Sequence, residues 1–129
     1  MYKLFITSML IISLQATAES TNPIMKGLIV SELQKFELAA QVPAMQGFNI
    51  RARKIIVPAG VSIDKHDHKT RAGIVYIESG EIVEYRAELS RVLKAGDSLV
   101  EDATTVHSFE NTSDKDCVII AFDLPRADQ

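Results

Sequence analysis

The stretch GVSIDKHDHKTRAGIVYIESG (residues 60–80) holds two of the chain's three histidines, His66 and His68, on alternate positions after a glycine turn. On a β-strand, residues i and i+2 project from the same face, so both rings are expected on one side and Lys65 and Asp67 on the other. Two neighbouring imidazoles suit one metal ion, to which each offers a nitrogen at about 2.0–2.1 Å. The pair therefore predicts a metal site on a strand.

The third histidine, His107, lies in another strand-like run, TVHSFEN (residues 105–111). An antiparallel barrel can place this run beside the first histidine strand, although the two are about forty residues apart. All three rings would then converge on one ion. Three unrelated structural or surface histidines are the less favoured alternative.

The rest of the chain is rich in short β-type segments. FNIRARKIIV (48–57) alternates apolar and charged residues, which is typical of a half-buried strand. Further runs follow as GIVYI, EIVEYR, SRVLK, DSLVE and CVIIAFDL, separated by glycine-, proline- and aspartate-containing turns. This close spacing predicts an antiparallel all-β sandwich or small barrel. The segment 31–40 is ambiguous between a short helix and edge strands, and we expect it to be extended.

Size and charge exclude several classes of protein. The 129 residues carry a formal net charge of −3, so no large basic surface exists to hold nucleic acid or an anionic membrane. Arg51, Arg53 and Lys54 form a small basic cluster, which we interpret as a solvated strand face. Cys117 is the single cysteine, which rules out a disulfide within the chain, and its apolar surroundings predict a buried, inert thiol.

The first 18 residues have the pattern of a cleaved secretion signal. Lys3 precedes a largely apolar segment, Leu4–Leu14, and Ala16-Thr17-Ala18 fits the small-x-small cleavage site. We therefore expect Glu19 to begin the mature protein, export to the periplasm or exterior, and no membrane span after cleavage. A buried first strand is the alternative.

The spacing of these residues resembles the cupin superfamily. Residues 60–80 resemble the first cupin motif, G-x5-H-x-H-x3,4-E-x6-G, and residues 96–111 resemble the second, G-x5-P-x-G-x2-H-x3-N. The resemblance implies an all-β double-stranded β-helix, or jelly-roll, barrel over residues 48–129. Residues 19–47 are then expected to form an N-terminal lead-in with edge strands. The chain is similar to small secreted bacterial cupins.

Two positions depart from those motifs. Gly73 stands where the first motif has its metal-binding glutamate, and Asp102-Ala103-Thr104 replaces the P-x-G element of the second. The resemblance then implies a metal site of three neutral imidazoles, from His66, His68 and His107. Such a donor set suits a divalent transition metal (Fe, Zn, Ni or Cu) better than Mg or Ca.

Glu101, six residues before His107, is the candidate for an additional acidic group. It could ligate the metal or act as a base beside it, but a solvated carboxylate at a strand end is the favoured interpretation. Strand parity predicts that Tyr76 faces away from the cavity, and Asn111 is expected to bond backbone. The residues expected to line an apolar cavity are Val75, Ile77, Leu99 and Phe109.

The sequence leaves the activity open. Three-histidine cupins include oxygenases, and this resemblance implies a metal-dependent oxygenase acting on a small organic molecule. A non-catalytic module that captures a small ligand or a metal is the second hypothesis, and a barrel with an empty site is the third. The resemblance also implies a homodimer, to which the apolar content of residues 32–42 and 48–57 adds a modest cue.

Overall fold

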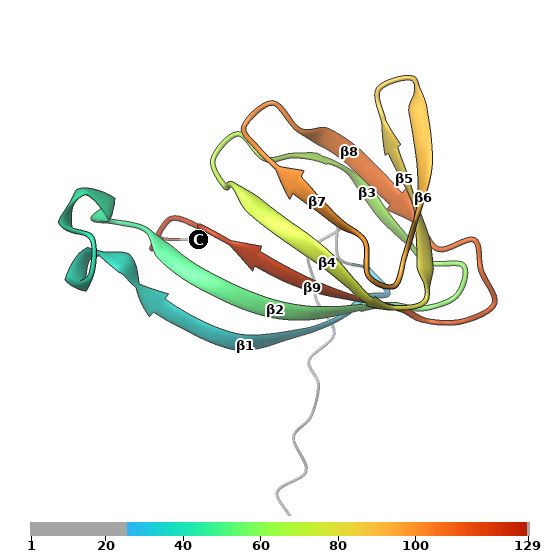
Figure 1. Ribbon diagram of the computed structural model, residues 1–129, viewed down its shortest axis with the longest axis horizontal. Coiled ribbons are helices and arrows are strands. Elements are labelled where there is room, and N and C mark those ends of the chain that lie inside the picture. The colour runs from blue at the N-terminus through green and yellow to red at the C-terminus, as the bar shows by residue number, and fades with distance from the viewer. Residues whose placement is uncertain (1–25, 129) are drawn as a thin grey trace, which may run out of the picture.

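The computed structural model describes residues 26–128, which form two antiparallel sheets (Figure 1). The five-stranded sheet has the order β1 (Ile29–Glu37), β2 (Asn49–Val57), β9 (Cys117–Asp123), β4 (Gly73–Ser79) and β7 (Ser98–Glu101). The four-stranded sheet has the order β3 (Ser62–Asp67), β8 (Val106–Glu110), β5 (Glu81–Arg86) and β6 (Leu89–Lys94). Non-consecutive strands are neighbours in both sheets, as expected for a barrel closed by long connections. The predicted all-β fold is confirmed.

The segment 31–40 is extended over most of its length, as expected. β1 runs to Glu37 and, among the strands that the structure describes, pairs only with β2, which makes it an edge strand. Two short 3-10 turns, η2 (Leu38–Ala40) and η3 (Pro43–Met45), then lead into β2. The predicted signal peptide lies outside the described residues. Within residues 26–128, no helix has the length and apolar character needed to cross a membrane.

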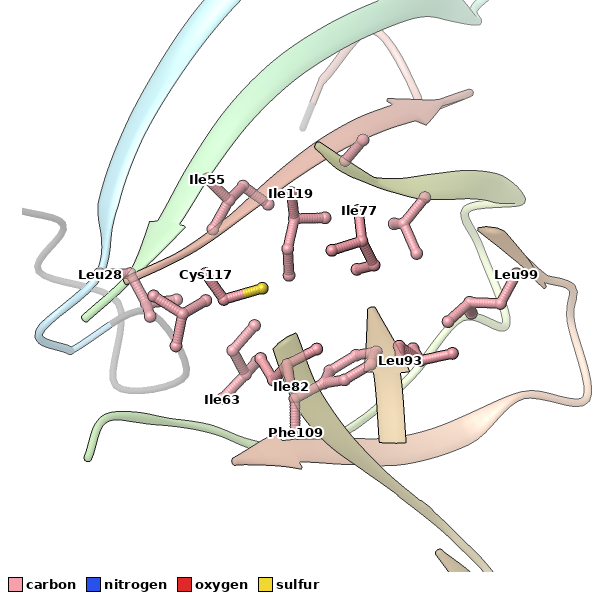
Figure 2. Close-up of a cluster of buried hydrophobic side chains, with 13 residues drawn as sticks. Leu28, Ile55, Ile63, Ile77, Ile82, Leu93, Leu99, Phe109, Cys117 and Ile119 are labelled. Atoms are coloured by element: carbon pink, nitrogen blue, oxygen red, sulfur yellow. The ribbon is translucent and has the colours of Figure 1, made fainter. Parts of the chain in front are cut away.

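The hydrophobic core lies between the inner faces of the two sheets (Figure 2). Ile55, Ile77 and Ile119 project from the five-stranded sheet toward Ile82 and Phe109 of the other sheet. The residues expected to line a cavity are packed into this core instead; they are Val75, Ile77, Leu99 and Phe109. Alternate residues of each strand point inward, and their side chains fill the barrel. Tyr76, of opposite parity, is 43% exposed as predicted.

Cys117 lies at the centre of this core with no exposed surface. Burial raises the pKa of its thiol to about 11, so the group stays protonated at neutral pH. The prediction of a buried thiol is confirmed.

A β-bulge sets the direction of the first two histidines. Ile63 of β3 pairs with Phe109 of β8, and His66 pairs with His107. The interval between the two pairs is therefore three residues long in β3 and two residues long in β8. The extra residue reverses the parity of β3 between Ile63 and His66. As a result Ile63, His66 and His68 all face the interior, although 63 is an odd position and 66 and 68 are even.

One inner-face row crosses the five-stranded sheet at the end that faces these histidines. Arg51 of β2 pairs with Asp123 of β9, Asp123 pairs with Gly73 of β4, and Gly73 pairs with Glu101 of β7. The prediction that Arg51 and Arg53 form a solvated face is wrong. Both side chains are only 14% exposed and bind Asp123, because their parity places them inside.

Candidate metal centre

The three histidines converge at one end of the barrel, as the sequence predicts. Their ring centroids are 4.8–5.0 Å apart, and one ligand-capable atom from each lies within 4.8 Å of the others. His107 is 1% exposed and His68 is 2% exposed, whereas His66 is half-buried. The site therefore has a closed inner side and one side that is open toward His66.

Backbone carbonyl groups accept hydrogen bonds from the Nδ1 atoms of His66 and His68. Nδ1 of His66 donates to the carbonyl oxygen of Asp64 at 2.8 Å, and this carbonyl belongs to the bulged segment of β3. Nδ1 of His68 donates to the carbonyl oxygen of Arg71 at 3.3 Å. Since a carbonyl oxygen only accepts, each Nδ1 carries the hydrogen and each Nε2 is left with a free lone pair.

A buried carboxylate performs the same task for His107. Nδ1 of His107 donates to Oε1 of Glu84 at 2.8 Å, and Glu84 also accepts hydrogen bonds from Arg86 and Arg91. Burial alone would raise the pKa of Glu84, but these hydrogen bonds lower it below the ordinary value. An ionised Glu84 therefore orients the His107 ring and keeps its Nε2 unprotonated.

Sequence reasoning missed Glu84, although a signal was present. In the strand EIVEYR, Glu84 has the same parity as the core residue Ile82, and each is 1% exposed. An acid at an inward position of a strand requires a buried partner, and the nearby strand holding His107 supplies it.

The facing nitrogens fit a bound cation. Nε2 of His68 and Nε2 of His107 lie 3.1 Å apart, and both carry lone pairs in the tautomers that the Nδ1 contacts of the two rings favour. Two such lone pairs repel unless a positive ion lies between them. Metal–nitrogen bonds of about 2.0–2.1 Å in a tetrahedral site place neighbouring ligand atoms roughly 3.3 Å apart. The donor set is therefore compatible with a divalent metal ion.

The electrostatic environment keeps the rings neutral. Burial lowers the pKa of His66 and of His107, and burial together with Arg71 lowers the pKa of His68 to about 4. A neutral imidazole is the form that binds a metal, so all three rings are available as ligands at neutral pH.

Glu101 lies inside the site, and its expected exposure as a solvated strand-end carboxylate is wrong. The residue is 7% exposed, with Oε1 at 3.5 Å from Nε2 of His107 and Oε2 at 3.5 Å from Nδ1 of His68. Burial raises the pKa of Glu101 to about 7, against the opposing effect of Arg71 and Arg53. Glu101, which the sequence analysis named only as a less favoured candidate base, is therefore in contact with the histidine cluster.

Asp102-Ala103-Thr104, which replaces the P-x-G element of the second motif, forms a turn. Oδ1 of Asp102 accepts hydrogen bonds from the backbone and hydroxyl of Thr104 and from the hydroxyl of Thr105. The carbonyl oxygen of Thr105 in turn accepts from the backbone N–H of His68 at 3.1 Å. Asn111 bonds the backbone carbonyl of Val57, which is the structural role expected for it.

A cavity of about 390 Å³ adjoins the histidines and includes His68 in its wall. Among residues 26–128, three cationic side chains line it, from Lys69, Arg71 and Arg126, and no acidic residue does. Its remaining walls are mostly apolar, from Met45, Phe48, Ala72, Ala103 and Leu124. The cavity thus combines an apolar surface with a positive potential, in a chain whose net charge is −3.

Solved structures with the same architecture cover most of the chain. A predicted oxalate decarboxylase from Thermotoga maritima is 27% identical, with a TM-score of 0.62 over 78% of this chain and 83% of that one. KdgF from Halomonas sp. is 20% identical, with a TM-score of 0.63 over 84% and 87%. A Cupin 2 conserved barrel domain protein from Salinispora arenicola is 20% identical, with a TM-score of 0.62 over 95% and 92%. These likenesses confirm the predicted double-stranded β-helix barrel.

No curated protein sequence matches the chain. The family model described as cupin domain matches residues 53–123, which contain all three histidines and both strands that carry them. This match covers more than half of the chain and agrees with the fold, with the histidine spacing and with the convergence of the three rings. The chain therefore belongs to the cupin domain family.

Proposed function

We propose that this cupin binds one divalent transition metal (Fe, Zn, Ni or Cu) through His66, His68 and His107 and acts as a metal-dependent enzyme on a small organic anion. The observation that carries the proposal is the pair of unprotonated Nε2 atoms of His68 and His107, 3.1 Å apart beside a cationic cavity. A bound ion would supply Lewis-acid chemistry and, as iron or copper, redox chemistry with O₂.

The cavity supports an anionic substrate. Arg126 is exposed, and its guanidinium stacks 4.9 Å over the ring of Phe48, which holds the charge at the wall while leaving N–H donors free to bind a carboxylate. Arg71 lies between this wall and the interior, and its carbonyl positions His68. A ligand bound by these two arginines would have its other end close to the histidines.

The similar Thermotoga maritima structure supports the same substrate class. It is described as a predicted oxalate decarboxylase, and oxalate is a small dicarboxylate. An O₂-dependent oxidation remains the first reaction class to test on this chain, and loss of CO₂ from a carboxylate is the second.

Metal binding is tested by dialysing the protein against zinc and measuring bound metal. We expect about one ion per chain in the wild type and a sharp loss in His107→Ala. Lys35→Gln, which alters an exposed residue of β1, serves as the control and should retain the metal. Full metal content in His107→Ala would contradict the proposed centre.

The substrate class is tested by calorimetry on the zinc-loaded protein with benzoate and its neutral analogue benzamide. Benzoate should bind more tightly, and Arg126→Gln should weaken benzoate by about three- to fivefold, the size expected for an exposed ion pair. Equal affinities for benzoate and benzamide would contradict an anion site. Turnover is then sought with the iron-loaded protein, following O₂ uptake and CO₂ release over a panel of small carboxylates, thiols and diketones.

The alternative function is a non-catalytic module that captures a small ligand or a metal. The partial exposure of His66 is compatible with it. Tight binding of metal and carboxylate without turnover of any compound in the panel would favour this alternative.

We also propose that the protein is a homodimer. An exposed apolar row crosses the outer face of the five-stranded sheet, with Val100 of β7, Ile74 of β4 and Phe122 of β9 in register and 48–60% exposed. A second copy of this sheet face is the partner that such a surface would match, since a two-fold axis makes it self-complementary. A monomer mass by light scattering at micromolar concentration would contradict this.

Export is the remaining part of the proposal, and the support for it is the N-terminal sequence alone. Mass spectrometry of the exported protein should find Glu19 as the first residue. Recovery of the chain with Met1 intact in a membrane fraction would contradict cleavage.

A further inference from the structure

We propose that Glu101 is the fourth protein ligand of the metal and replaces, from the neighbouring strand, the acid that Gly73 does not provide. The inference rests on the proposed metal centre. It concerns which side chains complete that centre, and it assigns the acidic ligand to β7 instead of β4.

The register of the sheet places Glu101 next to the empty position. Gly73 and Glu101 are direct partners in the β4–β7 pair, so their inward directions are adjacent. A Cβ added to Gly73 would lie 3.2 Å from Oε2 of Glu101 and 3.0 Å from the carbonyl oxygen of Phe122. The Glu101 carboxylate therefore occupies the space that a side chain at position 73 would enter. The glycine is what makes room for it.

The carboxylate also stands at ligand spacing from the histidines. Oε1 of Glu101 is 3.5 Å from Nε2 of His107, and Nε2 of His107 is 3.1 Å from Nε2 of His68. Both distances lie within a few tenths of an ångström of the roughly 3.3 Å between neighbouring ligand atoms in a tetrahedral site. Oε1 of Glu101 is therefore placed to bind an ion held by the two rings.

The second acid of the same row is not available for this role. Asp123 accepts from Arg51 and Arg53 at 2.8–3.0 Å, and Nε of Arg71 approaches it to 3.4 Å. Glu101, by contrast, has no arginine or lysine within ion-pair distance and receives no hydrogen bond from residues 26–128, although its side chain is only 9% exposed. A buried carboxylate without such partners is stabilised by a cation.

The charge balance favours the same assignment. Three neutral imidazoles leave both charges of a divalent ion uncompensated in a barrel end that already contains Arg51, Arg53 and Arg71. One carboxylate in direct contact removes half of that excess. Glu84 does not do so, because it bonds the far nitrogen of His107 and is already paired with two arginines.

The test compares zinc binding by calorimetry in the wild type, Glu101→Gln, Glu101→Ala and His107→Ala. Glu81→Gln, an exposed acid on β5, is the matched control. Loss of a residue that hydrogen-bonds to a metal ligand lowers metal affinity roughly 10–100-fold. Because Glu101 is proposed to bind the metal directly, its loss should lower the affinity at least as much. Melting curves of the metal-free variants verify that each is folded. Substitution with Co(II) provides a second readout, since its visible absorption reports the ligand set, and Glu101→Gln should alter the spectrum while Glu81→Gln should not.

The outcomes separate this inference from the metal centre itself. If the wild type binds zinc, His107→Ala loses it and Glu101→Gln keeps wild-type affinity with an unchanged Co(II) spectrum, the centre stands and the Glu101 assignment is overturned. If the wild type binds no zinc, both are overturned. A zinc-loaded crystal structure should show a Glu101 oxygen at about 2.0–2.2 Å from the ion, and an ion bound by the three rings with both oxygens outside bonding distance would also overturn the assignment.

Discussion

Replacing Glu101 by glutamine should stabilise the metal-free protein and lower its affinity for zinc. Without a metal, Glu101 is a carboxylate buried beside neutral rings, and burial raises its pKa from 4.5 to about 7. Glutamine has nearly the shape of the protonated acid and carries no charge. The substitution therefore removes the unfavourable burial of the charge and leaves the packing in place.

The magnitude follows from the displacement of the pKa. The interval from 4.5 to about 7 corresponds to about 3 kcal/mol at about 1.4 kcal/mol per pKa unit. Below pH 4.5, the acid is protonated in both the folded and the unfolded state, and the two proteins should have nearly equal stability. As the pH rises toward 7, the unfolded state releases its proton first, so the wild type loses stability through this interval and Glu101→Gln does not. Above pH 7 the variant should be more stable by about 3 kcal/mol.

The assay is urea unfolding in chelator, followed by far-ultraviolet circular dichroism because the chain contains no tryptophan. The free energies of unfolding of the wild type and Glu101→Gln are compared at pH 4.5 and pH 8. At pH 8 all three histidines are neutral in both proteins, because burial lowers their pKa values, so the difference there reports the Glu101 charge. Saturating zinc should then reduce the variant's advantage by about 1.4 kcal/mol for each tenfold by which the wild type binds zinc more tightly. A metal-free variant that is no more stable than the wild type at pH 8 would refute the reasoning.

Three further outcomes are expected. Glu84→Gln should weaken zinc binding by roughly 10–100-fold without abolishing it, because the substitution loosens the His107 ring but removes no ligand, and calorimetry measures this. Gly73→Glu should lower both zinc affinity and melting temperature, since its Cβ would lie 3.2 Å from the Glu101 carboxylate; a rise in affinity would contradict the crowding. Between pH 7 and 5, the zinc affinity of Glu101→Gln should depend less on pH than that of the wild type, because burial lowers the pKa of all three histidines, whereas the wild type should lose up to about tenfold per pH unit as Glu101 is protonated.

Local patterns were sufficient for much of the architecture. The alternation of apolar and polar residues located the strands, because side-chain direction on a strand repeats every two residues. The motif spacing around His66, His68 and His107 predicted that the three rings meet, and the structure brings them together. Both features depend on intervals along one strand or on a family pattern, and neither requires the cross-strand register to be known.

The tertiary structure decided that Glu101 and Asp123 face the site. The sequence treated Glu101 as a solvated strand end and Arg51 as an exposed cation, yet both lie in one inward row with Gly73 and Asp123. Residues 51 and 123 are paired across 72 positions of sequence. No local pattern reports such a pairing, because it is fixed by the register of strands that are distant in the chain.

The β-bulge is the second feature that required the fold. An uninterrupted strand would place Ile63 and His66 on opposite faces, and the extra residue in β3 places both inside. The same irregularity turns the carbonyl of Asp64 toward His66 and thereby selects the nitrogen that is left free for a metal. The sequence thus determined which residues carry the chemistry, and the pairing of distant strands determined their orientation, because side-chain direction in a sheet depends on registers that only the complete barrel sets.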